Sequence, residues 1–298
     1  MDPAARSDDT LVLIAPYRPP FAFGVVARYL ALRAFGGAEA VTGNRYVRSV
    51  RLGNDTGWIA VAPIPDADAL EVVVPAHFAG HRNEILERVS RLFDLAADPA
   101  IIDALLGADP LLAARVAAAP GLRVPGTFDR FELVVRAVLG QQVSVKGATT
   151  LATRLVAFVG TRLETPFPEL THACPTAETL AGLAPATLAK IGLPLQRAAT
   201  LVALGAAVAE GRIALDSDDP PAIAAALQSL PGIGPWTAQY VVMRALGDPD
   251  AFPSGDLGLQ KALRAGERVS ARELERHAEA WRPWRAYAAM HLWHSSSD

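Results

Sequence analysis

The sequence predicts an α+β protein, in which an N-terminal antiparallel sheet with helices is followed by an all-helical core. Short runs rich in β-branched residues alternate with helical stretches over roughly the first hundred residues. From Asp98 onward, alanine-rich amphipathic segments alternate with Pro and Gly breaks, so we expect no further strand. The predicted domains are therefore residues 1–97 and residues 98–298.

In the first domain, the β-like runs are Thr10–Ala15, Tyr46–Leu52, Trp58–Val61 and Leu70–Val74. Gly53-Asn54-Asp55 is a hairpin signal between the second and third runs. Apolar residues at helical spacing predict helices over Phe23–Ala34 and Glu84–Leu95. No catalytic constellation stands out here, so we interpret this domain as a structural partner of the core.

In the core, apolar residues at i, i+3, i+4, i+7 and i+8 from Phe131 predict a buried helix face. Gly140–Ser144 should break that helix, which resumes over Val145–Val159. We expect a loop over Pro166–Pro175, short helical turns over Thr176–Ile191 and a longer helix over Gln196–Glu210. The last helices are expected over Leu257–Arg264 and Ala271–Glu279, and before His294.

Composition excludes several classes of protein. A chain of 298 residues with 51% hydrophobic residues can form substantial cores. Cys174 is the single cysteine, which excludes a disulfide framework and a four-cysteine metal or iron–sulfur site. The net charge of −3 argues against a strongly basic nucleic-acid binder, so any DNA contact must be local. Without a signal-peptide or membrane-span pattern, we expect a cytoplasmic protein with no membrane contact.

The most informative stretch is Leu230–Ala238, Leu-Pro-Gly-Ile-Gly-Pro-Trp-Thr-Ala. Gly232 and Gly234 flank Ile233 in a tight turn, and Pro235 occupies the first position of a following helix. Helical spacing before the turn predicts a second helix there. The unpartnered N–H groups of the turn and helix start form an anion site, which we expect to include Gly232, Ile233, Gly234 and Thr237.

This motif, followed twenty residues after Trp236 by Asp256 in a Phe-Pro-Ser-Gly-Asp-Leu-Gly-Leu loop, resembles the helix–hairpin–helix superfamily of DNA base-excision glycosylases. The phrase Leu-Gly-Gln-x-Val-Ser-Val and the stretch from Trp281 to Trp293 are similar to the bacterial 3-methyladenine DNA glycosylase II (AlkA) family. The resemblance extends from about Leu11 to Trp293. It implies a helix–hairpin–helix glycosylase core of two helical lobes with the active-site cleft between them.

Asp256 is the candidate catalytic residue. Breaking an N-glycosidic bond builds positive charge on the sugar, and a nearby carboxylate stabilises that charge and orients the attacking water. A purely structural role as the N-cap of the next helix is the alternative, and both roles can coexist.

Trp236 and Tyr240 lie four residues apart on one helix face, and we expect both to line a base pocket. The resemblance places Trp236 in that pocket and matches Trp293 to another of its aromatic positions. An indole face attracts a positively charged alkylated purine. Aromatics at this spacing are also common in cores, which is the competing interpretation for Tyr240. Strand-cleaving relatives carry a Schiff-base lysine at the Trp236 position, so the resemblance implies a monofunctional enzyme that uses water.

Gln142, in the break between two helices, stands where the family usually has an apolar wedge that fills the gap left by a flipped base. The alternative is an ordinary exposed loop residue. The resemblance also implies a possible monovalent cation on the carbonyls of Gln228, Leu230 and Gly232, with no essential metal and no cofactor.

Together these features predict a monomeric DNA glycosylase that excises alkylated bases, of the 3-methyladenine and 7-methylguanine type, from double-stranded DNA associated with the nucleoid. A non-catalytic helix–hairpin–helix DNA-binding protein is one alternative. A glycosylase for oxidised or deaminated bases is the other.

Overall fold

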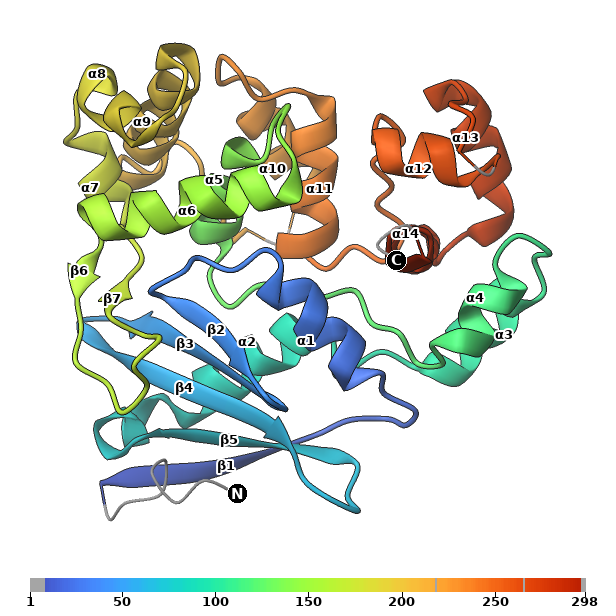
Figure 1. Cartoon of the computed structure of the whole chain (residues 1–298), viewed down its shortest axis with the longest axis horizontal. Coiled ribbons are helices and arrows are strands. Elements are labelled where there is room, and N and C mark those ends of the chain that lie inside the picture. Colours follow the sequence, from blue (N-terminus) through green and yellow to red (C-terminus); the bar gives the residue numbers. More distant parts are fainter. Residues whose placement is uncertain (1–8, 218, 265, 296–298) are drawn as a thin grey trace.

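A five-stranded antiparallel sheet forms the N-terminal part of the structure, in the order β1-β5-β4-β3-β2 (Figure 1). The strands are β1 (Thr10–Pro16), β2 (Glu39–Thr42), β3 (Arg45–Leu52), β4 (Asp55–Pro63) and β5 (Ala69–Pro75). The computed structural model describes residues 9–217, 219–264 and 266–295. Four of the strands and the hairpin at Gly53 confirm the prediction, whereas β2 was not predicted.

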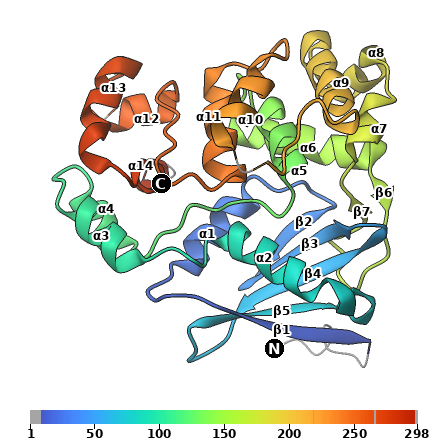
Figure 2. The same cartoon turned by 180° about the vertical axis from the view of Figure 1, so that it is seen from behind.

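Two helices cover one face of this sheet (Figures 1 and 2). Side chains from α1 (Phe23–Ala31) and α2 (Arg82–Phe93) pack into a common core with the inward residues of the strands. Helix α1 ends before the predicted Ala34, because the amides of Arg33 and Ala34 donate to carbonyls only three residues back. The short helix η2 (Ala76–His81) connects β5 to α2.

The expectation that no strand follows Asp98 was wrong. A small antiparallel pair is present, in which β7 (His172–Ala173) lies within the predicted loop Pro166–Pro175 and β6 (Thr161–Arg162) precedes that loop. The arm between these strands covers the second face of the sheet, where Phe167 contacts the Trp58 ring edge-on with centroids 5.0 Å apart. Contact with the sheet, rather than local pattern, therefore orders this segment.

The remaining elements are helices, mostly as predicted. They are α3 (Pro99–Gly107), α4 (Ala113–Ala118), α5 (Arg130–Leu139), α6 (Val145–Val159), α7 (Ala177–Ala181), α8 (Pro185–Leu188), η3 (Ala189–Ile191), α9 (Leu195–Ala209), α10 (Pro220–Gln228), α11 (Pro235–Ala245), α12 (Leu257–Ala262), α13 (Ala271–Ala278), η4 (Glu279–Trp281) and α14 (Arg285–Ser295). Helix α12 ends at Ala262 instead of the predicted Arg264.

Helix α11 lies between two hydrophobic cores. Ala238, Val242 and Met243 belong to the core that the sheet shares with the C-terminal helices, whereas Tyr240 and Val241 belong to the core of α5–α10. Because the helix packs against a core on each side, all its residues from Thr237 to Ala245 except Gln239 are buried. The N-terminal end of α11 is thereby fixed against both halves of the molecule.

Within the described ranges, no single helix is long and apolar enough to cross a membrane. The bent pair Pro185–Ile191 and Leu195–Ala209 meets the length and composition test only when its two helices are taken together.

Candidate active site

The turn between α10 and α11 presents unpaired backbone N–H groups to solvent. Gly232 has φ +91°, a conformation that glycine adopts freely. A Cβ at this position would lie 2.3 Å from the Thr200 hydroxyl oxygen, so no other residue fits without a shift. Among the described residues, no acceptor faces the N–H groups of Gly232, Gly234, Trp236 or Thr237. These groups have the unpaired donors that an anion site requires, and the site stays a prediction.

Two predictions about this turn need correction. Gly234 has φ −96°, and a Cβ built on it would meet no atom within 4 Å. The turn could therefore hold a residue with a side chain at this position without backbone strain. Ile233 and Thr237 bury their side chains, and the Ile233 amide donates to the Leu230 carbonyl within the turn. Of these two residues, only the Thr237 amide is free to face a phosphate.

The connection between α5 and α6 is joined to this turn. The side-chain amide of Gln141 donates to the Gly232 carbonyl at 2.8 Å and to the Thr237 hydroxyl at 3.0 Å. The next residue, Gln142, is exposed and has φ +55°, which is unusual for a residue with a Cβ. Gln141 therefore fixes the connection, and Gln142 projects from it.

Asp256 is the N-cap of α12, and its Oδ1 atom accepts the Leu259 amide at 3.0 Å. The same carboxylate accepts two indole N–H groups, from Trp236 at 3.2 Å and from Trp293 at 3.0 Å. Three donors from α11, α12 and α14 thus hold one half-buried carboxylate. The two interpretations of Asp256, capping and a poised carboxylate, are compatible in this geometry.

The predicted pocket aromatics lie together. The rings of Trp236 and Tyr240 are stacked, with centroids 5.4 Å apart and planes 13° apart. Trp293 lies at 6.3 Å from Tyr240 in a tilted arrangement. Trp281 and Tyr287 are buried in the core.

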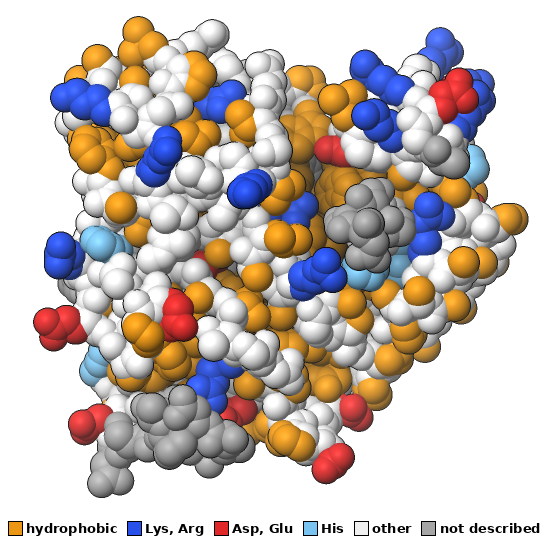
Figure 3. All heavy atoms as spheres, in the orientation of Figure 1, with side chains coloured by type: hydrophobic (Ala, Val, Ile, Leu, Met, Phe, Trp, Pro, Cys, Tyr) orange, Lys and Arg blue, Asp and Glu red, His pale blue; other side chains and the backbone are white. Residues whose placement is uncertain are grey.

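These residues line one cavity of about 960 Å³. Its wall contains Asp256, the three aromatics, the α5–α6 connection, and the glycines of both the turn and the Asp256 loop. Figure 3 shows a hollow lined with hydrophobic side chains on this side of the molecule, with Lys and Arg side chains at its edge. The volume is sufficient for a nucleobase with part of its sugar.

The N-terminal domain also contributes to the cavity, which the sequence did not predict. Tyr29 of α1 and Arg33, just beyond the end of α1, line the wall together with Arg136 of α5. The Tyr29 hydroxyl lies 3.3 Å from that of Tyr240, and Arg244 donates to the Tyr240 hydroxyl at 2.7 Å. Tyr29 sits at a position of α1 indistinguishable in sequence from a core aromatic.

The charges around these two tyrosines separate their pKa values. Burial raises the pKa of Tyr29 to about 12, despite the opposing effect of Arg244. Burial also acts to raise the pKa of Tyr240, but Arg244, Arg33 and a hydrogen bond from Tyr29 outweigh it and lower the value to about 8. Arg33 and Arg136 in the cavity wall, and Arg244 hydrogen-bonded to Tyr240, give this part of the cavity a positive potential.

Of the predicted cation ligands, Leu230 and Gly232 lie in the turn, whereas Gln228 is the last residue of α10. The carbonyl of Leu230 accepts the Ile233 amide, and that of Gly232 accepts the Gln141 side chain, which leaves each oxygen one further lone pair. The donor set is compatible with a monovalent cation, and the site stays a prediction. Within the described ranges, no cluster of three or more His, Cys, Asp or Glu could hold a metal ion.

Comparison with known families places two models on the chain. The AlkA N-terminal domain matches residues 10–129. The HhH-GPD superfamily of base excision DNA repair proteins matches residues 135–286, which include the hairpin and Asp256.

Individual relatives agree with these matches. DNA-3-methyladenine glycosylase 2 of Escherichia coli is 36% identical over 94% of this chain and 95% of its own. The Mycobacterium tuberculosis "Probable bifunctional transcriptional activator/DNA repair enzyme AlkA" is 44% identical over 97% of this chain, which spans only 58% of that longer relative. A solved 3-methyladenine DNA-glycosylase from Archaeoglobus fulgidus has the same fold, with a TM-score of 0.83, 20% identity, and coverage of 94% of this chain and 97% of its own.

Proposed function

The chain belongs to the AlkA family within the HhH-GPD superfamily of base excision DNA repair proteins, and on this basis we propose that it is a DNA glycosylase that excises alkylated bases. The observation that carries the proposal is the Asp256 carboxylate, held by two indole N–H groups in an aromatic cavity beside unpaired turn amides. A bare DNA-binding hairpin would need neither the carboxylate nor the cavity.

In this proposal Asp256 acts on the sugar. Departure of the base leaves positive charge on the C1′ and ring oxygen atoms, and a fixed carboxylate stabilises it. The indole and amide donors orient the carboxylate in advance, so little reorganisation accompanies the reaction. Asp256 also orients water for attack on C1′ and accepts its proton.

Trp236, Tyr240 and Trp293 receive the flipped base. Stacked rings present π faces, which bind a positively charged 3-methyladenine or 7-methylguanine through their quadrupoles as well as by burial. A cationic base leaves as a neutral molecule, so the site needs no dedicated general acid.

DNA binding is assigned to the turn and the α5–α6 connection. The amides of Gly232, Gly234 and Thr237 bind a phosphate, the buried Ile233 side chain supports the turn, and Gln142 enters the duplex in place of the flipped nucleotide. One chain supplies all of these groups, which favours a monomer. Its proposed substrate is double-stranded DNA, through which it would associate with the nucleoid. No cofactor enters this chemistry.

The nucleophile in the proposal is water rather than an amine. The lysines of the chain, Lys146, Lys190 and Lys261, are absent from the cavity wall, and Trp236 occupies the position of the Schiff-base lysine in strand-cleaving relatives. The enzyme is therefore monofunctional and leaves an intact abasic strand.

Base release from methylated duplex DNA, identified by chromatography, tests this proposal. The parent should release methylated purines without cutting the strand, and Asp256→Asn should reduce the single-turnover rate by about 10²–10³-fold or more while retaining DNA binding. The exposed Asp66→Asn, outside the cavity, is the matched control. Near-parent turnover by Asp256→Asn would sink the catalytic assignment, and no base release by the parent would sink the function.

A further inference from the structure

Two aromatic side chains of α11, Trp236 and Tyr240, lie between the Asp256 carboxylate and the Arg244 guanidinium. Trp236, Tyr240 and Arg244 are spaced at i, i+4 and i+8, so they follow one another along one helix face. Trp236 donates to Asp256, and Arg244, one turn beyond Tyr240, donates to the Tyr240 hydroxyl. The two stacked rings therefore lie between a negative end and a positive end.

Two further guanidinium groups strengthen the positive end. Arg33 and Arg136 line the cavity itself, and the Arg33 guanidinium lies 3.7 Å above the centre of the Tyr29 ring. Among the ion pairs of the described residues, none includes Arg33, Arg136 or Arg244. Arg33 is the half-buried member of this set, so its charge is the most adjustable by mutation.

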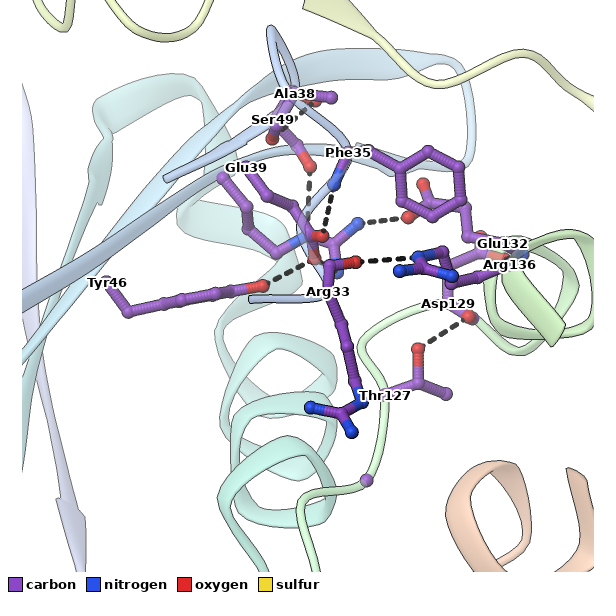
Figure 4. A network of polar contacts seen from close by, with 12 residues as sticks. Arg33, Phe35, Ala38, Glu39, Tyr46, Ser49, Thr127, Asp129, Glu132 and Arg136 are labelled. Carbon is purple, nitrogen blue, oxygen red and sulfur yellow. Dashed lines mark hydrogen bonds and ion pairs between the residues drawn. The ribbon is translucent and has the colours of Figure 1, made fainter. Parts of the chain in front are cut away.

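Glu39 and Glu132 pair with a different arginine, Arg48. Glu39 accepts the Tyr46 hydroxyl, the Phe35 amide and Arg48, while Glu132 accepts the other arm of Arg48. Figure 4 shows this network, with the Arg33 side chain directed away from Glu39 and its carbonyl accepting from Arg136. The network fixes the backbone of Arg33 but does not neutralise its guanidinium.

We propose that Arg33, supported by Arg136 and Arg244, supplies a positive potential on the base side of the cavity that assists departure of the base. The inference rests on the proposed glycosylase function. When the C1′–N bond breaks, its electron pair goes to the base, and C1′ becomes positive. Asp256 stabilises the sugar, and the guanidinium groups stabilise the increase in negative charge on the base.

The positive potential should speed the departure of both cationic and neutral bases. A cationic base becomes neutral as it leaves, which relieves its repulsion from Arg33, whereas a neutral base becomes an anion, which Arg33 attracts. Water supplies hydroxide to C1′ and Asp256 accepts its proton, which then passes to solvent or to the departing anion, so both reactions balance. Repulsion also implies that Arg33 weakens binding of a cationic lesion while speeding its excision.

Arg33→Met keeps the stem over Tyr29 but removes the charge, and Arg33→Lys keeps a charge. We expect Arg33→Met to lower the single-turnover rate on 7-methylguanine duplex by about tenfold, less than a fully buried group because Arg33 is partly solvated. The concentration for half-maximal rate should stay equal or fall, and Arg33→Lys should recover most of the rate. Arg28→Met, on the exposed side of α1, is the control, and thermal unfolding checks each variant.

The outcomes distinguish failure of the Arg33 role from failure of the proposed glycosylase function. A parent-like rate for Arg33→Met, a change in half-saturation alone, or no recovery by Arg33→Lys would each overturn the role of Arg33 and leave the glycosylase assignment standing. Absence of base release by the parent overturns both. With a neutral hypoxanthine duplex that the parent cleaves, the rate loss should be at least as large, and a loss confined to one lesion class would also overturn the inference.

Discussion

The indole N–H of Trp293 donates to Oδ1 of Asp256 across 3.0 Å, and thereby connects α14 to the N-cap of α12. The same oxygen accepts the Leu259 amide, so the carboxylate is fixed both by its own helix and by a second one. The orientation of Asp256 consequently depends on where α14 packs.

Trp293→Phe should slow base excision without preventing folding. The substitution keeps an aromatic face but removes the donor, and hydrogen bonds to a charged group are worth about 1.5–3 kcal/mol. Part of that loss should reach the transition state, so we expect a decrease of about tenfold in single-turnover rate. Trp284→Phe, which changes a half-buried indole outside the cavity wall, is the control. A parent-like rate for Trp293→Phe would show that this hydrogen bond does not position the carboxylate.

Gly232→Ala and Gly234→Ala should separate folding from DNA binding. At Gly232 an added Cβ meets the Thr200 hydroxyl and an unfavourable φ, so we expect a loss of about 1–3 kcal/mol in the free energy of unfolding. At Gly234 the Cβ points into open space, and unfolding should resemble the parent. That Cβ should nevertheless stand where a phosphate approaches the amides and weaken duplex binding.

Denaturant unfolding and titration of an abasic-site duplex measure the two effects. If Gly234→Ala binds the duplex as tightly as the parent, the open side of the turn does not face the phosphate.

Much of the fold follows from local pattern, and the exceptions share a cause. The long strands show β-branched runs and the helices show regular apolar spacing, so both were predictable. β6 and β7 have two residues each, which is too short for a pattern, and they are ordered where the Phe167 arm packs on Trp58. These strands depend on a tertiary contact, which the spacing of residues in the sequence does not reveal.

The residues of the cavity also fall into those that local pattern predicts and those that only tertiary packing brings there. Asp256, Trp236 and Gly232 belong to one contiguous motif, so their proximity was predictable from its spacing. Tyr29 reaches Tyr240 across 211 positions of sequence, and an apolar helix face contains other aromatics that only fill the core. Arg33 likewise looks like any solvated cation until α5 and α11 pack beside it.

Acidification should destabilise the protein through His291. Burial, followed by the charges of His294 and Arg115, lowers the pKa of His291 from 6.5 to about 4. A lowered histidine pKa means that the unfolded chain binds the proton more tightly, so stability is complete above pH 6.5 and falls as the pH drops toward 4. At pH 5 this contribution amounts to about 2 kcal/mol.

His291→Gln should remove this part of the pH dependence. Denaturant unfolding at pH 7 and pH 5 should show a smaller decrease for this variant than for the parent, with the exposed His77→Gln behaving like the parent. Equal decreases in parent and His291→Gln would exclude His291 as the source. Because Trp293 follows two residues later on α14, we expect excision to decline in the same pH range.

Gln142 tests how the duplex is held open. Flipping a nucleotide costs a few kcal/mol of lost stacking and pairing, and a side chain that fills the gap offsets part of this. A leucine fills the gap with little desolvation, whereas glutamine must lose water or bond to the orphaned base. Gln142→Leu should tighten binding to abasic duplex modestly, and Gln142→Ala should weaken it by about fivefold, which corresponds to roughly 1 kcal/mol.

The φ of +55° does not distinguish these variants, because glutamine, leucine and alanine all carry a Cβ. The cavity wall offers three other exposed apolar side chains, Val143 at 40%, Val145 at 42% and Leu257 at 54% exposure, so truncation of each to alanine is a matched control. Each variant should leave excision of an already flipped base nearly unchanged. If Gln142→Ala binds as tightly as the parent while one of these truncations weakens binding, the wedge is that residue and Gln142 only connects two helices.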